Sequence, residues 1–538
     1  MEAGPGTRTR LGTRRGGRRL SERAEILRRL GEAAVWDVLV IGGGATGLGA
    51  AVEAASRGYK TVLIERADFA KGTSSRSTKL VHGGVRYLEQ MNITLVMDAL
   101  RERGLMLANA PHLVHDLSFV VPIFGLLDLP YYGLGLKVYE LLSGKLSLGP
   151  SRMLSQKETL ALLPGVRREG LRGGVLYHDG QFDDARYAVS LMRTLEELGG
   201  IAINYVEATG LIERNGKLVG VRARDVESDA GFDLQAKVVI NATGVFTEQV
   251  LAMDDDRETL LSVSQGTHFV LPPSFLASEH AMMIPKTSDG RVLFAIPWHG
   301  ATVVGTTDEA VERSSTEPRA MASERSFLME HIGKYMGRRP QAEEILSVWS
   351  GLRPLVRKGG GATSKLSRDH TILVRPSGLV TVTGGKWTTY RRMGEDTINR
   401  AAEVGGLRRE PSRTASLRLH GWTRDVAANE SERVYGSDLA QLQELSASDP
   451  ALDAPLHPQL PYKMREVVWA VRHEMARTVE DVLARRTRAL FLNAKAALEA
   501  ASAVADVLAR ELGRSETWKL RDLEAFSVVA HGYIYEEA

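Results

Sequence analysis

Residues 36–65 read WDVLVIGGGATGLGAAVEAASRGYKTVLIE, and this stretch decides the fold. Its two ends, residues 36–41 and 59–64, are short apolar runs rich in β-branched residues, which is typical of buried strands. Between them, a G-x-G-x-x-G turn opens a segment of small and apolar residues with helical spacing. The order strand, glycine turn, helix, strand predicts a βαβ unit that binds a dinucleotide.

Each position of this fingerprint has a physical role. Gly42 permits the tight turn, and Gly44 lets the backbone approach a pyrophosphate. Gly47 allows the helix to pack closely on the strand. Glu65 ends the second strand, where its carboxylate can accept hydrogen bonds from a ribose diol. The pattern indicates a dinucleotide but does not decide between FAD and NAD.

The next polar segment, residues 72–90, reads GTSSRSTKLVHGGVRYLEQ. Its small hydroxyls and glycines would let a loop wrap a flat cofactor, and its cationic side chains would suit an anion. The competing interpretation is a solvated polar surface loop.

At this point the chain resembles the FAD-dependent glycerol-3-phosphate dehydrogenases, a family within the glutathione-reductase-like flavoproteins. The similarity runs in family order from about Asp37 to past residue 490. It is carried by GGGATGLGAA (42–51), NATGVF (241–246), QGTH (265–268), IPWHG (296–300), GTTD (305–308), SGLRPL (350–355), LSRDH (366–370), GGKWTTYR (384–391) and ARRTR (484–488).

The predicted fold class is α/β: a glutathione-reductase-like FAD-binding fold with an interleaved α+β substrate or cap domain and an all-helical C-terminal domain. We place the first two in residues 36–410 and the helical domain in residues 411–538. Residues 291–298 and 301–308 read as a hairpin. In the helical domain, the four-residue spacing of apolar side chains from Val467 to Leu483 predicts one amphipathic helix, and residues 495–512 predict another.

Composition excludes several kinds of chemistry. The 538 residues contain no cysteine, so disulfides, thiolate zinc sites, iron–sulfur clusters and cysteine nucleophiles are excluded. A net charge of +3 gives no reason to expect nucleic-acid binding, and no metal-ligand spacing is seen. Residues 1–35 are rich in arginine and predict a basic, disordered extension, with a mitochondrial presequence or an anion-binding tail as alternatives.

The resemblance implies that FAD is the cofactor and that several segments contact it. The small-residue turn after residues 236–241 and the helix that follows residues 384–385 are where such flavoproteins pass the cofactor. The implied cofactor-binding residues are Gly42, Gly44, Gly47, Glu65, Ser75, Ser77, Lys79, His82, Gly83, Ala242, Gly244, Gly385 and Thr388.

The implied reaction oxidises the C2 hydroxyl of sn-glycerol 3-phosphate to the ketone of dihydroxyacetone phosphate, with hydride passing to FAD. A phosphate dianion calls for guanidinium forks. Within family-like motifs, Arg86, Arg353 and Arg368 are the candidates, and Tyr87 can donate its hydroxyl to the same phosphate. Arg368 could instead brace a neighbouring loop.

Lys386 follows two glycines and could stabilise the substrate oxygens or the reduced flavin; otherwise it pairs with a structural carboxylate. His268 is the candidate catalytic base because imidazole titrates near working pH. His82, an arginine or a water molecule remain open as the base. Arg353 and Lys386 complete the predicted catalytic set with His268. Asp308 is read as closing a turn in preference to orienting a cation.

Two further positions are singled out. Asp183 and Asp184 are expected to cap a helix starting near Arg186. Gln265 stands where some family members place lysine, so part of the pocket's charge would shift to Arg353 or Lys386 if that position faces the pocket.

By resemblance, the electron acceptor is a respiratory quinone, reached by a protein peripheral on the cytoplasmic face of the membrane, or at the inner mitochondrial membrane in a eukaryote. Residues 127–146 could form an ordinary cap-domain helix or an interfacial amphipathic helix that carries Tyr131, Tyr132, Leu136, Tyr139 and Leu142 beside lysines. Two alternatives remain for function: an oxidase that uses O₂ and makes hydrogen peroxide, and a non-catalytic FAD-binding module. A homodimer is also possible.

Overall fold

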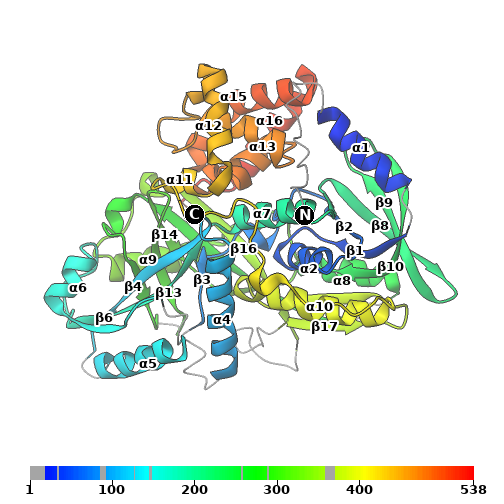
Figure 1. Ribbon diagram of the computed structural model, residues 1–538. Coiled ribbons are helices and arrows are strands. Elements are labelled where there is room, and N and C mark those ends of the chain that lie inside the picture. The colour runs from blue at the N-terminus through cyan, green and yellow to red at the C-terminus, as the bar shows by residue number, and fades with distance from the viewer. Residues whose placement is uncertain are drawn as a thin grey trace, which may run out of the picture.

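The computed structural model describes residues 19–32, 35–84, 93–125, 128–143, 148–255, 259–287, 290–357 and 370–537. It has three parts (Figure 1): a sheet beside α2 (Ala45–Ser56) and α10 (Tyr390–Val404), a second sheet, and a group of C-terminal helices above both. This arrangement confirms the predicted fold class.

The first sheet is the nucleotide-binding sheet. Its central strand β1 is flanked by parallel strands on both sides, and β10 extends beyond the sheet to pair with an antiparallel hairpin. In order across the sheet the described strands are β17 (His370–Val374), β18 (Val380–Gly384), β10 (Gly231–Asn241), β1 (Trp36–Ile41), β2 (Thr61–Ile64) and β7 (Ile201–Ile203), with β8 (Val206–Arg214) and β9 (Lys217–Asp225) forming the hairpin.

Both faces of the first sheet are buried, which explains why residues 36–41 are continuously apolar. Val38 and Val40 pack in one core with α2, α10 and α7 (Asp184–Glu197). Leu39 and Ile41 point to the opposite core, which is closed by the hairpin and by α8 (Thr247–Leu251).

The second sheet is mainly antiparallel and holds ten described strands. Residues 293–298 and 301–305 form the predicted hairpin, with Trp298 opposite Ala301. The strands of the second sheet are β15 (Glu309–Val311), β11 (Leu261–Leu271), β14 (Ala301–Gly305), β13 (Leu293–Trp298), β12 (Ala281–Ile284), β4 (Val114–Ile123), β6 (Gly173–Phe182), β3 (Leu80–Val81), β16 (Ser347–Val356) and β5 (Arg152–Ser155).

The C-terminal helices are not an isolated body, because they share one hydrophobic core with the second sheet. Trp349 of β16 packs against Phe491, with ring centroids 5.3 Å apart. On the other face of this sheet lie α6 (Gln156–Leu162) and α9 (Ala322–Tyr335). The C-terminal helices are α11 (Glu430–Arg433), α12 (Leu439–Ser448), α13 (Met464–His473), α14 (Ala489–Leu492), α15 (Ala494–Leu512) and α16 (Glu516–His531).

The prediction of a single helix from Val467 to Leu483 is wrong. Helix α13 ends at His473, and Met475 has a left-handed backbone with φ of 56°. A separate π-helical turn, η12, spans Asp481–Arg486. The apolar spacing continued because Val467, Val479 and Leu483 all enter the same core, although they do so from two elements.

The expectation of disorder throughout residues 1–35 is also wrong. Residues 19–31 form helix α1 (Arg19–Gly31), whose Leu30 is buried beneath the first sheet. Arg23 of this helix donates a hydrogen bond of 2.6 Å to Asp225 at the end of β9. A carboxylate partner far along the chain therefore holds a segment that composition alone reads as a tail.

Two further helices, α4 (Ile93–Asn109) and α5 (Asp128–Ser143), pack against the second sheet. The apolar side chains predicted for an interfacial stripe of α5 instead enter the core: Leu136 and Tyr139 are buried. The opposite face of α5 carries Leu134 and Leu141, which are 69% and 71% exposed. No helix among the described residues is long and apolar enough to cross a membrane.

Candidate active site

Two cavities meet between the sheets. The smaller, of about 230 Å³, lies at the ends of β1, β2 and β10, and the larger, of about 540 Å³, lies against the second sheet. Thr73, Pro354 and residues 385–387 line both cavities, so the two spaces form one cleft. We call them the nucleotide cavity and the substrate-side cavity.

The glycine turn shapes the nucleotide cavity. Gly42 has φ of 113°, and a Cβ there would lie 2.6 Å from the carbonyl oxygen of Ala242. A Cβ on Gly47 would collide with the carbonyl oxygen of Gly42. Glycine at these positions therefore lets α2 begin directly against β1 and β10, and the positive end of the helix faces the cavity.

Glu65 closes the other side of this cavity and ties the neighbouring loop to the glycine turn. Its Oε2 accepts a hydrogen bond of 2.6 Å from the Gly43 amide, and its Oε1 accepts one of 2.9 Å from the Ala67 amide. The amide of Ala45, in the first turn of α2, donates to the hydroxyl of Ser74 at 2.9 Å. Burial raises the pKa of Glu65 above its usual value, although the two amide bonds oppose this rise.

Arg353 lines the substrate-side cavity from β16. It pairs with Asp308 at 3.4 Å and donates to the Thr306 hydroxyl and the Thr307 carbonyl, both at 3.1 Å. Gly266 makes room for this side chain, because a Cβ there would collide with the guanidinium. Asp308 thus orients a cationic side chain. This is the less favoured of the two roles considered for it from the sequence, the other being to close a turn.

His268 lines the same cavity from β11 and is almost fully buried. Its ring stacks on Trp349 with a centroid distance of 4.0 Å, and its Nε2 lies 2.9 Å from the Thr78 hydroxyl. Burial, together with the charges of Lys79 and Arg353, holds the pKa of His268 well below 6.5. The imidazole is therefore neutral at pH 7, with one nitrogen available as an acceptor.

Lys386 lies where the two cavities join, immediately before the short helical turn η8 (Trp387–Thr389). Gly385 before it has φ of 78°, which favours glycine. Trp387 fixes the turn by donating from its indole to the Ser74 carbonyl at 2.8 Å. The lysine side chain is thereby held at the point where a cofactor in one cavity would meet a substrate in the other.

Comparison with known proteins decides the family. The family described as FAD dependent oxidoreductase matches residues 37–391, and the C-terminal domain of alpha-glycerophosphate oxidase matches residues 380–519. The mitochondrial glycerol-3-phosphate dehydrogenase of Rattus norvegicus is 38% identical over 526 residues, covering 91% of this chain and 72% of the relative. The probable mitochondrial glycerol-3-phosphate dehydrogenase of Caenorhabditis elegans is 39% identical over 540 residues, covering 94% and 74%.

The chain belongs to the FAD-dependent glycerol-3-phosphate dehydrogenase family. Among solved structures, the glycerol-3-phosphate dehydrogenase of Bacillus halodurans, complexed with FAD, matches with a TM-score of 0.78 and 29% identity, covering 97% of this chain and 100% of that one. The alpha-glycerophosphate oxidase of Mycoplasma pneumoniae matches with a TM-score of 0.56 and 18% identity, covering 72% and 98%, which shows a shared fold.

FAD is the cofactor of this flavoenzyme, as the sequence predicted, and the described residues fit it. An extended dinucleotide needs a cleft that passes a helix N-terminus, and the two joined cavities provide one beside α2. Several of the predicted cofactor residues line this cleft, and they come from five separate segments: Gly42, Gly44, Glu65, Ser77, His82, Ala242, Gly244, Gly385 and Thr388.

Three predicted cofactor residues, Ser75, Lys79 and Gly83, line neither cavity. Lys79 is fully buried, with its ammonium 2.8 Å from the Asp184 carboxylate, and burial lowers its pKa to about 7. Gly83 packs beneath Tyr139, whose hydroxyl accepts its amide hydrogen at 2.8 Å. These three residues thus lie behind the loop residues that line the cleft. Gly47 is also absent from the cavity lining, because its role is helix packing.

Other expectations have mixed outcomes. Asp183 caps α7 by accepting from the Arg186 amide at 3.0 Å, as predicted. Gln265 faces away from the cleft and donates to Glu324 at 2.7 Å, so the position does not charge the pocket. The predicted substrate ligands Arg86, Tyr87 and Arg368 lie outside the described residues.

Sequence reasoning missed a set of buried arginines that reach the cofactor loops from the C-terminal domain. Arg485, Arg486 and Arg488 are each at most 2% exposed, and all three contact residues of the 65–79 segment. The motif ARRTR was noticed, but nothing in a sequence separates a buried arginine from a solvated one.

Proposed function

We propose that this chain oxidises sn-glycerol 3-phosphate to dihydroxyacetone phosphate and passes the electrons to a quinone at a membrane surface. The observation that carries the proposal is that Arg353 and a neutral His268 line one cavity, which joins the nucleotide cavity at Lys386. Curated relatives named as mitochondrial glycerol-3-phosphate dehydrogenases support the substrate.

Arg353 binds the phosphate of the substrate in this scheme. A guanidinium presents two parallel donors that match the oxygens of a phosphate, and Thr306 and Asp308 fix its plane. Arg86, Tyr87 and Arg368 join it as proposed ligands, on the strength of the family resemblance. Lys386 stabilises the oxygen that becomes the ketone.

His268 accepts the proton of the C2 hydroxyl. Loss of two electrons from the alcohol requires that a hydride leaves C2 and a proton leaves the oxygen; when bound, FAD supplies the hydride acceptor. A neutral imidazole can take the proton, and Thr78 holds the ring by its hydroxyl. The stacked Trp349 keeps the ring plane fixed and excludes water from one face.

The decisive experiment adds glycerol 3-phosphate to the holoenzyme without oxygen and follows the flavin absorbance near its long-wavelength maximum. We expect bleaching, followed by recovery when a soluble quinone analogue is added. An unbleached flavin contradicts the proposed substrate. Rapid recovery with O₂ and none with the quinone would instead assign the oxidase reaction.

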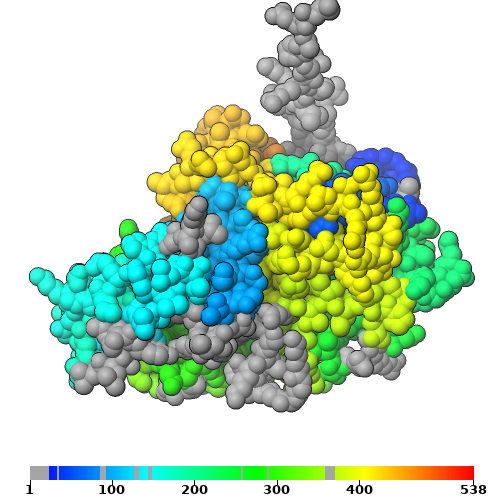
Figure 2. All heavy atoms as spheres, turned by 60° about the horizontal axis from the view of Figure 1, so that its bottom comes forward, coloured from blue at the N-terminus to red at the C-terminus, as the bar shows by residue number. Residues whose placement is uncertain are grey.

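We further propose that the enzyme lies peripherally on a lipid bilayer through α4, α5 and β5. Ile93 and Met97 of α4, Leu134 and Leu141 of α5, and Met153 of β5 are exposed apolar side chains on neighbouring elements. Figure 2 shows α4 in blue and the α5 region in cyan on one face of the molecule. Helix α5 also lies beside the substrate-side cavity, since its Tyr132 lines that cavity.

Vesicle co-sedimentation tests this membrane face. We expect Leu134→Ser combined with Leu141→Ser to reduce binding to vesicles of mitochondrial lipid composition. The matched control, Leu520→Ser with Val528→Ser on α16, removes side chains of nearly the same exposure, 59% and 61%, on another part of the molecule. Equal loss of vesicle binding in both pairs would contradict the assignment.

A further inference from the structure

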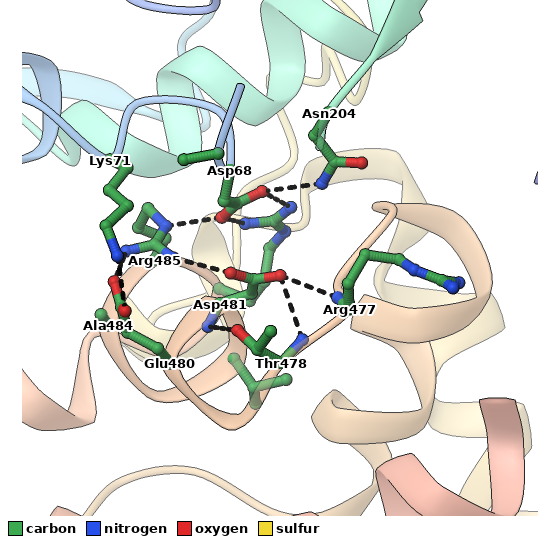
Figure 3. Close-up of polar contacts among 12 residues, drawn as sticks. Asp68, Lys71, Asn204, Arg477, Thr478, Glu480, Asp481, Ala484 and Arg485 are labelled. Carbon is green, nitrogen blue, oxygen red and sulfur yellow. Dashed lines mark hydrogen bonds and ion pairs between the residues drawn. The ribbon is translucent and has the colours of Figure 1, made fainter. Parts of the chain in front are cut away.

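The loop that follows β2 is held from the C-terminal domain by buried charges. Figure 3 shows Asp68 of this loop facing Arg485 and Asn204, with Asp481, Glu480 and Lys71 around them. Residues 481–488, which we call the arginine segment, comprise the π-helical turn η12 and the two residues after it. More than 400 positions separate Asp68 from its arginine partners, as in the pair Asp68 and Arg485 with a separation of 417.

Asp68 has all of its acceptor capacity engaged. Arg486 donates to both carboxylate oxygens, at 2.7 and 2.9 Å, and Arg485 donates to Oδ2 at 2.5 Å. Asn204 donates to Oδ1 at 3.1 Å. Burial alone would raise the pKa of Asp68, but the two guanidinium groups hold it well below its usual range.

The arginine segment is itself braced, so it is a rigid support. Arg485 also donates to Glu480 and Asp481, both at 2.7 Å, and Arg486 donates to the Glu474 carbonyl. Asp481 in turn accepts from the amides of Arg477 and Thr478, at 2.8 and 3.1 Å. A buried ion pair is weak evidence for stability, because desolvation offsets most of the Coulomb attraction. Such a pair can nevertheless fix the position of the loop that carries one of its partners.

The neighbours of Asp68 in the chain touch the glycine turn directly. The Ala70 amide donates to the Gly43 carbonyl at 3.0 Å, and the Ala67 amide donates to Glu65 at 2.9 Å. Phe69 lies under Gly43, so closely that a Cβ on that glycine would come within 2.8 Å of its ring. Moving Asp68 would therefore displace Glu65 and the wall of the nucleotide cavity.

Arg488 makes the equivalent connection to the flavin side. It donates to the Ser75 carbonyl at 2.8 Å and to Asp184 at 3.0 Å. Asp184 accepts from both the amide and the hydroxyl of Ser77, at 3.0 and 2.7 Å, and Ser77 lines the substrate-side cavity. Lys71, which lines the nucleotide cavity, is bound to Glu480 at 2.7 Å. The arginine segment and the adjacent Glu480 thus hold the loop at Asp68, Lys71 and Ser75.

We propose that Arg485, Arg486 and Arg488 are positioning residues for FAD: they fix the 65–79 loop in its binding geometry from the C-terminal domain. They touch neither cavity and act through Asp68, Ser75 and Asp184. The proposal concerns cofactor retention and is independent of which alcohol is oxidised. In this view the C-terminal domain is part of the FAD site.

The test compares FAD release from holoenzyme variants. Asp68→Asn with Arg486→Gln removes both charges together and leaves no buried charge unpaired, so the fold is expected to persist. We expect FAD to dissociate ~10–100-fold faster, because two charge-assisted contacts that hold the loop are lost. Hydrogen exchange should rise in residues 65–79 before it rises in α2. Glu480→Gln removes the carboxylate that binds Lys71 and Arg485, and it should give a smaller change in the same direction.

Arg465→Met is the matched control. Arg465 is buried in the same domain and pairs with Glu432 and Asp453, but none of its contacts reaches the 65–79 loop. It should lower the unfolding temperature and leave FAD release unchanged. Wild-type release and wild-type loop exchange in both Glu480→Gln and the double variant would overturn the proposal, as would equal release from the Arg465→Met control.

Discussion

The two cavities of the cleft are built in different ways. The nucleotide cavity is lined at the ends of two adjacent strands by residues with little or no side chain, namely Gly42, Gly44, Ala242 and Gly244. The substrate-side cavity is walled by side chains, among them His268, Arg353 and Lys386, that come from separate strands and turns. The first should fail as a unit, whereas the second should lose one function at a time.

Gly47→Val tests the nucleotide cavity and should have the broadest effect, because a protein that loses FAD loses all of its activity. The new side chain would collide with the Gly42 carbonyl and push α2 away from β1. We expect the affinity for FAD to fall by ~10–100-fold or more, since overpacking a rigid site costs ~1–3 kcal/mol, occasionally more. Titration of apoprotein with FAD measures this. Gly135→Ala in α5, where a Cβ meets nothing within 4 Å, should bind FAD normally.

Arg353→Met tests whether the substrate-side cavity can lose phosphate binding while FAD stays bound. Methionine keeps much of the volume and removes the charge that is proposed to bind phosphate. We expect kcat/KM for glycerol 3-phosphate to fall by ~100–1,000-fold, as for a charged hydrogen-bonding group worth ~3–4 kcal/mol. FAD content should stay at the wild-type level. Unchanged kinetics would remove Arg353 from the substrate site.

His268→Gln should lower kcat with a smaller effect on KM, because the residue is proposed to move a proton. A lost general base typically costs ~10²–10⁴-fold. The same residue sets a pH signature. Because the pKa of His268 lies below 6.5, the wild-type enzyme should keep its base neutral down to that pH. Arg353→Met removes one of the charges that depress this pKa. The acid limb of the variant's residual activity should therefore move to higher pH.

The nucleotide cavity could be predicted from the sequence because the residues that shape its glycine turn are close together in the chain. The spacing of Gly42, Gly44 and Gly47 and the acid at Glu65 fix a turn, a helix start and a strand end within 30 residues. In the substrate-side cavity, family motifs predicted His268, Arg353 and Lys386. The pairing of Arg353 with Asp308 could not be predicted, because it depends on how distant strands meet.

What the sequence could not supply was the direction of each side chain. Lys79 and Ser77 lie in one loop and both bind Asp184, yet Ser77 also lines the cleft whereas Lys79 does not. The arginines of residues 485–488 looked no different from the many solvated arginines of the chain. Only the buried carboxylates that meet them, Asp68 and Asp184, reveal what they hold.

His420→Gln should have the smallest effect and should spare both cavities. His420 bridges Glu197 of α7 and Asp438 of the C-terminal domain, at 2.6 and 2.7 Å. Burial opposes protonation, but the hydrogen bonds to Asp438 and Glu197 raise its pKa to about 9. A pKa raised on folding adds stability that is complete below about pH 6.5 and is lost as pH rises through about 9.

The wild-type unfolding temperature should therefore decline between pH 6.5 and 9, and the decline should be shallower in the glutamine variant. FAD content and kcat/KM at pH 7 should match the wild type, because His420 lines neither cavity. A parallel pH dependence in both proteins would show that another group controls this range. A loss of FAD would show that the boundary of α7 with the C-terminal domain is coupled to the nucleotide cavity, as the arginine segment is proposed to be.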